Sequence, residues 1–508
     1  MGRYLKSKYT IILIILLGLI LRLVVINQSL WLDEAIGALV VKEQSYRQIL
    51  TQFPLSDNHP PLYYLTLKAW TDIFGYSEVS LRMPSVIFGE LTIYITYLMA
   101  NRLVSYGLRV TGSKTETHNS ITRNALAFPT ISALLIATSG FHIYYSQEAR
   151  MYSMAAFFAT LSIYSFVNIF KGVKYKHFVN PWVMFSVAVT LLIFSDYLPV
   201  FILPVFWLYA ILAKSNKTWW VKFFLSHSPI FLFGLLWLPI FRIQSEHGNW
   251  LLTTLPAWRN VAGGATVKQA ALVWTKFTLG RISLFNKLIY YFLITVSSIP
   301  FVVSLLRVWV DREKTKILWF WLFIPLLLAF AVSFWFPAFI YFRFVFVIPA
   351  FYLLISWGIS QVKTNKIKNI LIISLLLVNM TGWLIYVFAE GQQREQWREA
   401  VRFIEENGKA QDVVIFDFPE PFSAFRWYEK GEVLAYGATD SISASSASYN
   451  KTKEIIDVYG GVFYFEYLYD LTDPNRYVEK ALVDSGFILR EQYTQFYGLG
   501  SINYYKRN

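Results

Sequence analysis

Long apolar segments are the feature that most limits what this chain can fold into. A helix needs about 20 apolar residues to cross the roughly 30 Å hydrocarbon core of a membrane. Such runs recur along the 508 residues, of which 56% are hydrophobic and 15% are charged. Soluble domains carry roughly 25% charged residues. The sequence therefore predicts a mainly α-helical, polytopic membrane protein.

About eleven segments qualify as membrane spans. Arg3, Lys6 and Lys8 precede the first run, which lacks a small-residue cleavage site, so we expect an uncleaved span. Arg22, near the outer end of this span, is expected to extend toward the lipid headgroups. The expected spans are residues 9–27, 83–100, 122–141, 151–170, 180–196, 197–213, 221–241, 286–306, 317–336, 341–360 and 369–389.

Positive charge is distributed unevenly between the connecting loops. A net charge of +14 would suggest a nucleic-acid partner in a soluble protein. Here lysines and arginines gather in every second loop, as the positive-inside rule describes. We therefore expect a multi-pass cell-membrane protein (plasma or inner membrane) with no nucleic-acid partner, a cytoplasmic N-terminus and an extracytoplasmic C-terminus. The chain has no cysteine, which excludes disulfides, thiolate nucleophiles and cysteine-ligated metals.

Two outer segments between the spans are unusually long. Residues 28–81 form a first outer loop, in which helical amphipathic spacing predicts interfacial helices over 34–50 and 61–74. Residues 242–281 are longer than a connection requires, and we expect this segment to be functional or to act as a lid.

From residue 391 onward the composition becomes that of a soluble domain. We predict a membrane domain over residues 1–390 and a small extracytoplasmic α/β domain over 391–508. Its expected elements are helices at 396–407 and 477–485, strands at 412–418, 433–436 and 461–467, and a terminal pair of strands.

Asp33 and Glu34 lie at the outer membrane edge, directly after the first span. Adjacent acids do not both face one side of a helix, so at most one is expected to be a working group. A membrane-level charge usually lines a wet cavity or has a partner. The alternative is that the pair stabilises the positive end of a helix dipole.

Two further outer segments carry polar groups that suit a ligand site. His59, before Pro60-Pro61, is either a simple helix cap or a group that binds a metal or a substrate hydroxyl. Glu148 and Arg150 are either a local ion pair, or a sugar- or cation-binding acid beside a phosphate-binding arginine. Several arginines on the outer side break the positive-inside trend, which indicates an anionic ligand.

Four motifs occur in a fixed order: SLWLDEA, DNHPPLYYLTLKAW, FGYSEVSLRMPSVIFG and FHIYYSQEARMYS. In this order the chain resembles the dolichyl- and polyprenyl-phosphate-mannose glycosyltransferase superfamily of the GT-C fold. More narrowly, it is similar to family 39/83-type proteins, which include protein O-mannosyltransferases and aminoarabinose transferases, and to proteins with an RgtA/B/C/D-like domain. The similarity covers about residues 8–240, and it is weaker at Arg343 and at 396–400.

The resemblance implies transfer of a hexose or pentose from a polyprenyl-phosphate donor to a lipid, glycan or protein acceptor on the outer face. The first outer-loop aspartate of such enzymes, here Asp33, is the expected general base of an inverting reaction. Because the leaving group is a phosphate, arginines take the place of a second, protonated acid. The expected substrate- and phosphate-binding residues are Glu34, His59, Arg82, Tyr145, Gln147, Glu148, Arg150 and Arg343.

A divalent cation is the one cofactor that this resemblance leaves open. Its expected ligands are Glu148, His59 and Asp196. Many relatives carry a His-Tyr pair where this chain has Asp196-Tyr197, so the role of that histidine either is absent here or has passed to Asp196.

Two alternative functions share these sequence features. A transporter or flippase of polyprenyl-linked sugars would need ionisable groups near the midplane, whereas here Glu90 is the main acid inside a span and the other charges lie at the outer rim. A ligase that transfers a preassembled glycan is the other alternative, and it would have a similar fold.

Overall fold

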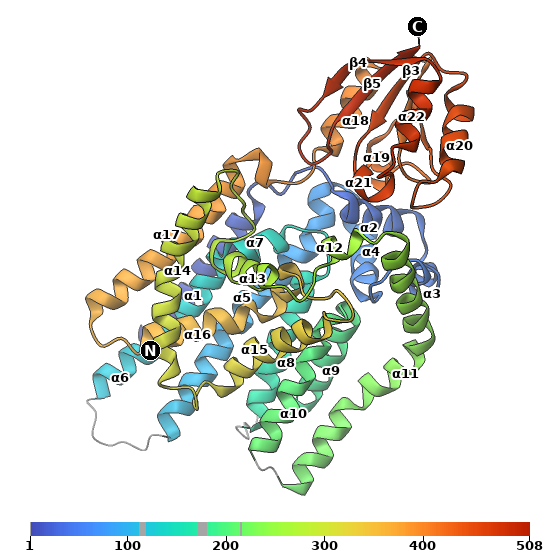
Figure 1. Cartoon of the computed structure of the whole chain (residues 1–508). Helices are drawn as coiled ribbons and strands as arrows, with labels where there is room; N and C mark the ends of the chain where they lie inside the picture. Colours follow the sequence, from blue (N-terminus) through green and yellow to red (C-terminus); the bar gives the residue numbers. More distant parts are fainter. Residues whose placement is uncertain (1, 111–117, 171–179, 214–215, 508) are drawn as a thin grey trace.

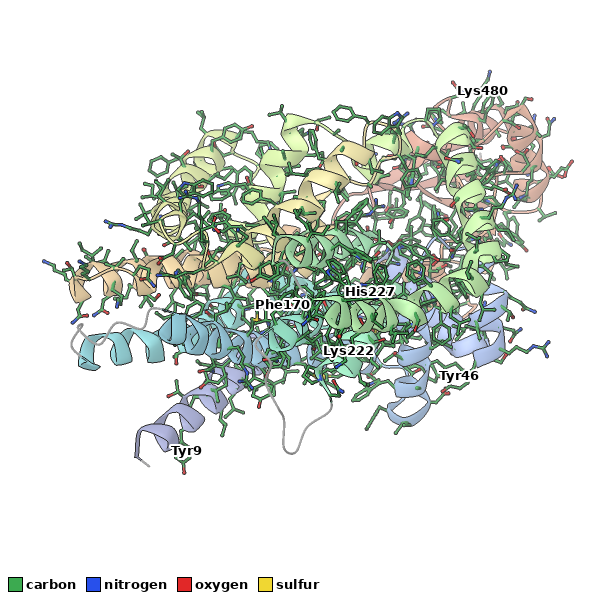
Figure 2. All side chains as sticks on the ribbon, turned by 90° about the horizontal axis from the view of Figure 1, so that it is seen from below. Tyr9, Tyr46, Phe170, Lys222, His227 and Lys480 are labelled. Carbon is green, nitrogen blue, oxygen red and sulfur yellow. The ribbon has the colours of Figure 1, made fainter. Side chains whose placement is uncertain are left out.

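The computed structural model describes residues 2–110, 118–170, 180–213 and 216–507. Two bodies are visible: a large helical domain and a smaller sheet-containing domain at the C-terminal end (Figure 1). Tyr9 of the first helix and Lys480 of the C-terminal domain lie at opposite ends of the molecule (Figure 2). The predicted inner basic loops fall partly on 111–117, 171–179 and 214–215, which lie outside the described residues.

Each apolar run predicted to be a membrane span coincides with a helix. Six helices are long and apolar enough to cross a membrane, the α6–α7 pair, bent by 59°, would make a seventh, and four shorter apolar helices accompany them within the described ranges. This confirms the predicted fold class. The helices are α1 (Gly2–Leu23), α5 (Glu78–Val110), α6 (His118–Thr138), α7 (Gly140–Ser146), α8 (Tyr152–Phe170), α9 (Pro181–Ser195), η2 (Leu198–Ile202), α10 (Leu203–Leu212), α11 (Lys217–Thr254), α14 (Lys287–Trp309), α15 (Lys316–Val332), η3 (Tyr341–Val347), α16 (Ile348–Ser360) and α17 (Asn365–Phe388).

The segment predicted to be the first outer loop, residues 28–81, contains helices at the expected places. They are α2 (Leu32–Glu43), α3 (Tyr46–Thr51), the short η1 (Phe53–Leu55) and α4 (Leu62–Phe74). The predicted helix over 34–50 is two helices, because Ser45 interrupts it with a capping box that starts α3. Helix α4 begins directly after Pro60-Pro61 and packs on α2 and α5.

The second outer segment is mostly helical. Helix α11 continues to Thr254 and stops before Pro256, and α12 (Trp258–Ala262) and α13 (Val267–Leu279) follow. Thr266 caps the start of α13, and Gly280 ends it with a positive φ of 83°, which glycine adopts without strain. Helix α13 packs against α14, α17 and η3, so the segment is part of the folded helical domain.

The C-terminal domain is built on a five-stranded mixed sheet with strand order β2-β1-β3-β5-β4. Strand β1 pairs in parallel with β2 and β3, whereas β5 pairs antiparallel with β3 and β4. The central strands β1 and β3 are buried along their whole length, as expected for strands covered on both faces. The strands are β1 (Asp412–Phe416), β2 (Leu434–Gly437), β3 (Gly461–Phe465), β4 (Phe487–Tyr493) and β5 (Ile502–Arg507).

Helices of the C-terminal domain connect it to the first outer loop. Helix α19 packs on α2, and the Tyr428 hydroxyl accepts a hydrogen bond from the backbone amide of Leu30 at 2.8 Å. The predicted boundary at residue 391 falls in the segment between α17 and α18. The helices are α18 (Trp397–Asn407), α19 (Ser423–Tyr428), α20 (Ser446–Ile456), α21 (Tyr469–Thr472) and α22 (Tyr477–Asp484).

Arg22 does not extend toward the headgroups, and that prediction is wrong. Its side chain is fully buried and forms an ion pair with Glu90 at 3.3 Å. It also donates to the Ala137 carbonyl and contacts His142 Nδ1 at 2.7 Å. Because an acid and a carbonyl inside the helical domain pair with the guanidinium, its charge is compensated without the membrane surface.

Close helix packing at Gly358 provides a test of this arrangement. A Cβ added there would lie 2.0 Å from the Ser304 carbonyl oxygen of α14, so Gly358→Ala must force α14 and α16 apart. We expect a loss of about 1–3 kcal/mol, measured as thermal unfolding in detergent. Gly234→Ala on α11 is the matched control, because within the described residues no atom beyond its chain neighbours and its own helical backbone lies within 4 Å of the added group. Equal effects of the two changes would contradict the packing.

Candidate active site

Asp33 and Glu34 occupy the first turn of α2 and have different surroundings. Glu34 is completely buried, whereas the Asp33 side chain is 35% exposed. Successive residues of a helix point in directions about 100° apart, which explains the separation. Only Asp33 is accessible to a substrate.

Glu34 forms a bidentate ion pair with Arg82 at the start of α5. Arg82 Nε and Nη2 donate to the two carboxylate oxygens at 2.9 and 2.5 Å, and the backbone amide of Ala149 donates to Oε1 at 2.7 Å. Burial raises the pKa of the Glu34 carboxyl, but Arg82, together with the charge of Arg394 and the Ala149 amide, outweighs burial, and the net direction is downward. Glu34 is therefore an ionised framework group.

Arg82 uses its remaining donors on the chain that enters α2. Its Nη atoms also donate to the carbonyls of Ile26, Gln28 and Ser29 at 2.6, 2.7 and 2.9 Å. A guanidinium has five N–H donors, and these bonds occupy all of them. Arg82 therefore has no donor left for a substrate phosphate, and the structure corrects its predicted role to one in the framework.

Glu148 does not pair with Arg150. Its carboxylate accepts from Arg394 at 2.7 Å, and Arg394 belongs to the segment that connects α17 to the C-terminal domain. Arg394 also donates to the Tyr144 hydroxyl at 2.6 Å, and its guanidinium lies 3.8 Å from the centre of the Tyr144 ring. The local Glu148–Arg150 ion pair that the sequence suggested is thus replaced by the long-range pair of Glu148 and Arg394.

Arg150 faces Asp33 instead. Its Nη2 atom lies 3.4 Å from Asp33 Oδ2 and 3.3 Å from His59 Nε2, and the other His59 nitrogen lies 3.1 Å from the Asp57 carboxylate. Arg150 is 5% exposed, and its Nε atom has no hydrogen-bond partner within the described ranges. Asp57, His59, Arg150 and Asp33 therefore form one continuous polar chain that ends at the exposed carboxylate.

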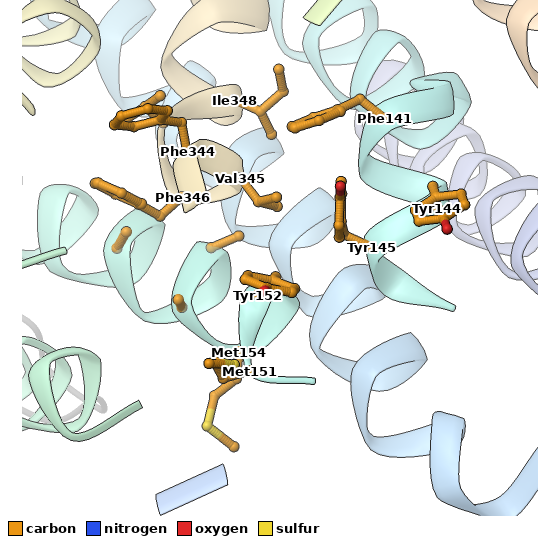
Figure 3. Packing of buried hydrophobic residues seen from close by; sticks show 14 of the residues in the cluster. Phe141, Tyr144, Tyr145, Met151, Tyr152, Met154, Phe344, Val345, Phe346 and Ile348 are labelled. Carbon is orange, nitrogen blue, oxygen red and sulfur yellow. The ribbon is translucent and has the colours of Figure 1, made fainter. Parts of the chain in front are cut away.

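Gln147 and Tyr145 occupy the wall behind this chain. The Gln147 amide donates to the carbonyls of Arg22 and Val24 at 2.7 and 2.6 Å and so holds the end of α1, next to Val25 with its positive φ of 52°. Tyr145 lies in an aromatic cluster with Phe141, Tyr144 and Tyr152 (Figure 3). Gln147 is thus a framework group, and Tyr145 belongs to the aromatic lining.

Arg343 and Asp196 come from η3 and from the end of α9. Arg343, in η3, donates to the Pro337 carbonyl at 3.2 Å and lies within electrostatic reach of Asp196, Tyr152 and Arg150. Asp196 ends α9 and accepts from the Leu198 amide at 3.3 Å. Both residues border the aromatic cluster, with Arg343 in position to add positive charge.

The three predicted metal ligands do not form one ligand set. Glu148 is paired with Arg394, His59 with Asp57, and Asp196 lies beside Arg343. Nowhere in the described parts of the chain do three His, Asp or Glu side chains gather as ligands for one ion. These residues do not fit a metal in this conformation, and metal dependence stays a prediction.

Arg281 is a site residue that the sequence did not single out. It follows α13, its guanidinium lies 4.7 Å from the centre of the Tyr144 ring, and it is near Tyr145, Tyr341 and Glu148. Within residues 2–110, 118–170, 180–213 and 216–507, neither Arg281 nor Arg343 has a carboxylate at ion-pair distance. In the sequence, Arg281 could have been found as an arginine at the end of a predicted outer segment, residues 242–281, that contains few acids.

Lys276 holds the loop that presents Arg281. Its ammonium donates to the Ile282 carbonyl at 2.5 Å and to the Ser283 hydroxyl at 3.0 Å, and the side chain is 3% exposed. Burial, with the positive charges of Arg281 and Lys287, lowers the pKa of Lys276 to about 7. Lys276 therefore holds the loop through hydrogen bonds, and its burial there makes the charged form of the amine less favourable.

The fold is found in solved membrane glycosyltransferases. A family model described as the protein O-mannosyl-transferase TMEM260 N-terminal domain matches residues 48–219. The apo structure of ArnT from Cupriavidus metallidurans covers 98% of this chain and 98% of its own, with 10% identity and a TM-score of 0.53. Its structure bound to undecaprenyl phosphate aligns over 99% and 98% of the two chains, with 9% identity and a TM-score of 0.52.

Two further proteins are similar to this chain. An Archaeoglobus fulgidus oligosaccharyltransferase, in complex with Zn and sulfate, covers 97% of this chain and 74% of its own, with 13% identity and a TM-score of 0.52. An uncharacterized protein of Aquifex aeolicus (strain VF5) is 26% identical over 213 residues, which is 42% of this chain and only 38% of that relative's length. The chain has the GT-C fold of membrane glycosyltransferases, as its motifs predicted.

The buried Glu34–Arg82 pair makes a testable prediction about stability. Glu34→Gln leaves the Arg82 charge buried without its carboxylate, so we expect a loss of about 3–5 kcal/mol, measured as thermal unfolding in detergent. Glu246→Gln, in the exposed Arg242–Glu246 pair, should change stability by less than about 1 kcal/mol. A Glu34→Gln protein as stable as the Glu246→Gln control would show that the pair does not support the fold.

Proposed function

We propose that this chain is a membrane glycosyltransferase that moves a hexose or pentose from a polyprenyl-phosphate donor to an acceptor on the outer face. The observation that carries the proposal is the state of the carboxylates at the site. Glu34 and Glu148 are each buried against an arginine, and Asp57 is held by His59, whereas Asp33 is exposed at the end of the polar chain. The GT-C fold supports the same class of reaction.

Asp33 acts as the general base in this proposal. Its carboxylate takes the proton from an acceptor hydroxyl, the hydroxyl oxygen forms a bond to C1 of the sugar, and the bond from C1 to the phosphate oxygen breaks. The electron pair of that bond leaves with the polyprenyl phosphate, so no acid is needed to protonate the leaving group. Arg150, 3.4 Å from Asp33, orients the carboxylate.

The phosphate of the donor is proposed to lie against arginines. Arg281 and Arg343 have no carboxylate within ion-pair distance in the described residues, and both border the cluster of Tyr145 and Tyr152. A dianionic phosphate leaving group is stabilised by such cations, particularly where nearby aromatic groups exclude water. The ArnT structure with undecaprenyl phosphate supports a donor of this class.

The outer position of the site is part of the proposal. The C-terminal domain packs on α2, beside Asp33, so the two share one side of the helical domain. The charge distribution of the loops favours the extracytoplasmic side for both. A divalent cation stays an option, and its test is transfer measured after chelation and again after Mg²⁺ or Mn²⁺ is restored.

The base assignment is tested with Asp33→Asn. Because the amide cannot take a proton, transfer of labelled sugar from a polyprenyl-phosphate hexose in proteoliposomes should fall by about 10²–10⁴-fold. The variant should be expressed and unfold thermally as the wild-type protein does, since Asp33 is partly exposed. Glu246→Gln serves as the control and should keep its turnover.

Three outcomes of this assay would overturn the assignment. Unimpaired turnover of Asp33→Asn would exclude Asp33 as the base. Movement of the labelled lipid across the membrane without any product would favour the flippase. Turnover only with a preassembled oligosaccharide donor would favour the ligase.

The donor-phosphate role is tested with Arg281→Gln. Loss of a charge-assisted contact is worth about 1.5–3 kcal/mol, so KM for the donor should rise about 10- to 100-fold. Arg242→Gln on α11 is the matched control, because that arginine is 81% exposed and pairs with Glu246 at the surface. An unchanged donor KM in Arg281→Gln would contradict the proposed contact.

A further inference from the structure

The segment between helix α17 and the C-terminal domain is bonded to the loop that carries Arg281. This segment, residues 389–398, is called the strap below. The Gln392 side-chain amide donates to the Ser283 carbonyl at 2.7 Å, and its oxygen accepts from the Ser283 backbone amide at 2.8 Å. A side chain that binds both the N–H and the C=O of one residue restrains the backbone of that residue. Gln392 therefore holds the backbone two positions after Arg281.

The other side of Arg281 is held by close packing. Gly280 has a positive φ of 83°, and a Cβ added to it would lie 3.1 Å from the carbonyl carbon of Gly140 in α7. The Lys276 ammonium donates to the Ile282 carbonyl at 2.5 Å. Arg281 thus lies between backbone positions that are fixed on both sides.

A second strap residue, Arg394, reaches the ring that contacts Arg281. It donates to the Tyr144 hydroxyl at 2.6 Å and to the Tyr144 carbonyl at 3.2 Å, and its backbone amide donates to the Gln28 side chain at 2.9 Å. The Arg281 guanidinium lies 4.7 Å from the centre of the same Tyr144 ring, within the distance at which a cation is attracted to an aromatic face. Arg394 therefore fixes the ring beside the Arg281 guanidinium.

We propose that the strap positions the donor-phosphate arginine: Gln392 fixes the backbone beside Arg281, and Arg394 fixes the Tyr144 ring that its guanidinium contacts. This inference rests on the proposed contact between Arg281 and the donor phosphate. Gln392 and Arg394 act through Arg281, so both are positioning residues. An arginine held in its binding direction loses less side-chain freedom when the phosphate arrives, which strengthens donor binding.

The far end of the strap joins this arrangement to the C-terminal domain. The Arg398 backbone amide donates to the Ser29 hydroxyl at 3.0 Å, and its Nη1 atom lies 3.3 Å from the Glu78 carboxylate. Helix α18 of the C-terminal domain begins at Trp397, so this end of the strap belongs to that domain. The C-terminal domain thus takes part in donor binding through the strap.

The role of Gln392 is tested with Gln392→Met, which keeps the length of the side chain and removes both bonds to Ser283. The KM for a labelled polyprenyl-phosphate hexose in proteoliposomes should rise about 3- to 10-fold, with kcat within about twofold of wild type. Thermal unfolding should be unchanged, because Gln392 is only partly buried and Ser283 is exposed. Gln393→Met is the matched control, since that amide donates to the Val387 carbonyl at 2.7 Å.

The double variant shows whether Gln392 acts through Arg281. Once the arginine is replaced, nothing remains for Gln392 to position, so Gln392→Met should raise the donor KM by less than about twofold in the Arg281→Gln background. A residue with a general structural role would have the same effect in both backgrounds.

A further readout does not depend on turnover. The Ser283 backbone amide loses its acceptor in Gln392→Met, so its hydrogen exchange should become faster than in the wild-type protein. Gln393→Met should leave the exchange of this amide at the wild-type rate.

Three results would overturn the role of the strap. They are a wild-type donor KM in Gln392→Met, an equal rise in KM with and without Arg281, and unchanged exchange at Ser283. Unchanged donor KM in Arg281→Gln would overturn the phosphate contact itself, and with it the positioning. A raised KM in Arg281→Gln beside a wild-type KM in Gln392→Met would overturn the positioning alone, so the two failures are distinguishable.

Discussion

The arrangement of the site depends on one buried ion pair, between Glu34 of α2 and Arg82 of α5. Removing two charges from water costs several kcal/mol for each ion, and the cost is offset only where every donor and acceptor is satisfied. Here Arg82 also binds three carbonyls of the chain between α1 and α2, and Glu34 also accepts from Ala149. The pair therefore joins three stretches that are distant in sequence, namely residues 26–34, the start of α5 and the segment before α8, and it fixes the direction in which α2 leaves the membrane edge.

That direction decides which carboxylate can react. With Glu34 anchored inward, Asp33 must point to a different side of the helix, where it meets Arg150 and solvent. Glu148 is likewise buried against an arginine, Arg394, which neutralises its charge. Arg281 and Arg343 have no such acid within the part of the chain that the structure describes. The site thus combines one accessible base with positive charge that an anionic leaving group would neutralise.

Local patterns in the sequence predicted the helices and strands well, because they depend on nearby residues. The apolar runs became helices, and the buried runs Asp412–Phe416 and Gly461–Phe465 became the central strands. Even the separation of Asp33 from Glu34 follows from helix geometry alone. The motif order also predicted the GT-C fold, since these segments share a fixed succession of spans and outer loops.

Side-chain partners were harder to predict, because they depend on tertiary packing. Glu148 pairs with a residue 246 positions away, although Arg150 is two positions away. Arg22 is held inside by Glu90, and only the contact between α1 and α5 brings them together. Charges near a membrane edge therefore indicate a site, but not the role of each residue.

The configuration of the product shows whether one carboxylate acts as a base in a single displacement. The wild-type protein would be given a polyprenyl-phosphate sugar of known anomeric configuration, and the glycosidic bond of the product would be assigned by NMR coupling constants. We expect inversion at C1, with no sugar bound to the protein. Retention of configuration, or a glycosyl adduct on Asp33 detected by mass spectrometry, would contradict it, because Asp33 would then be a nucleophile.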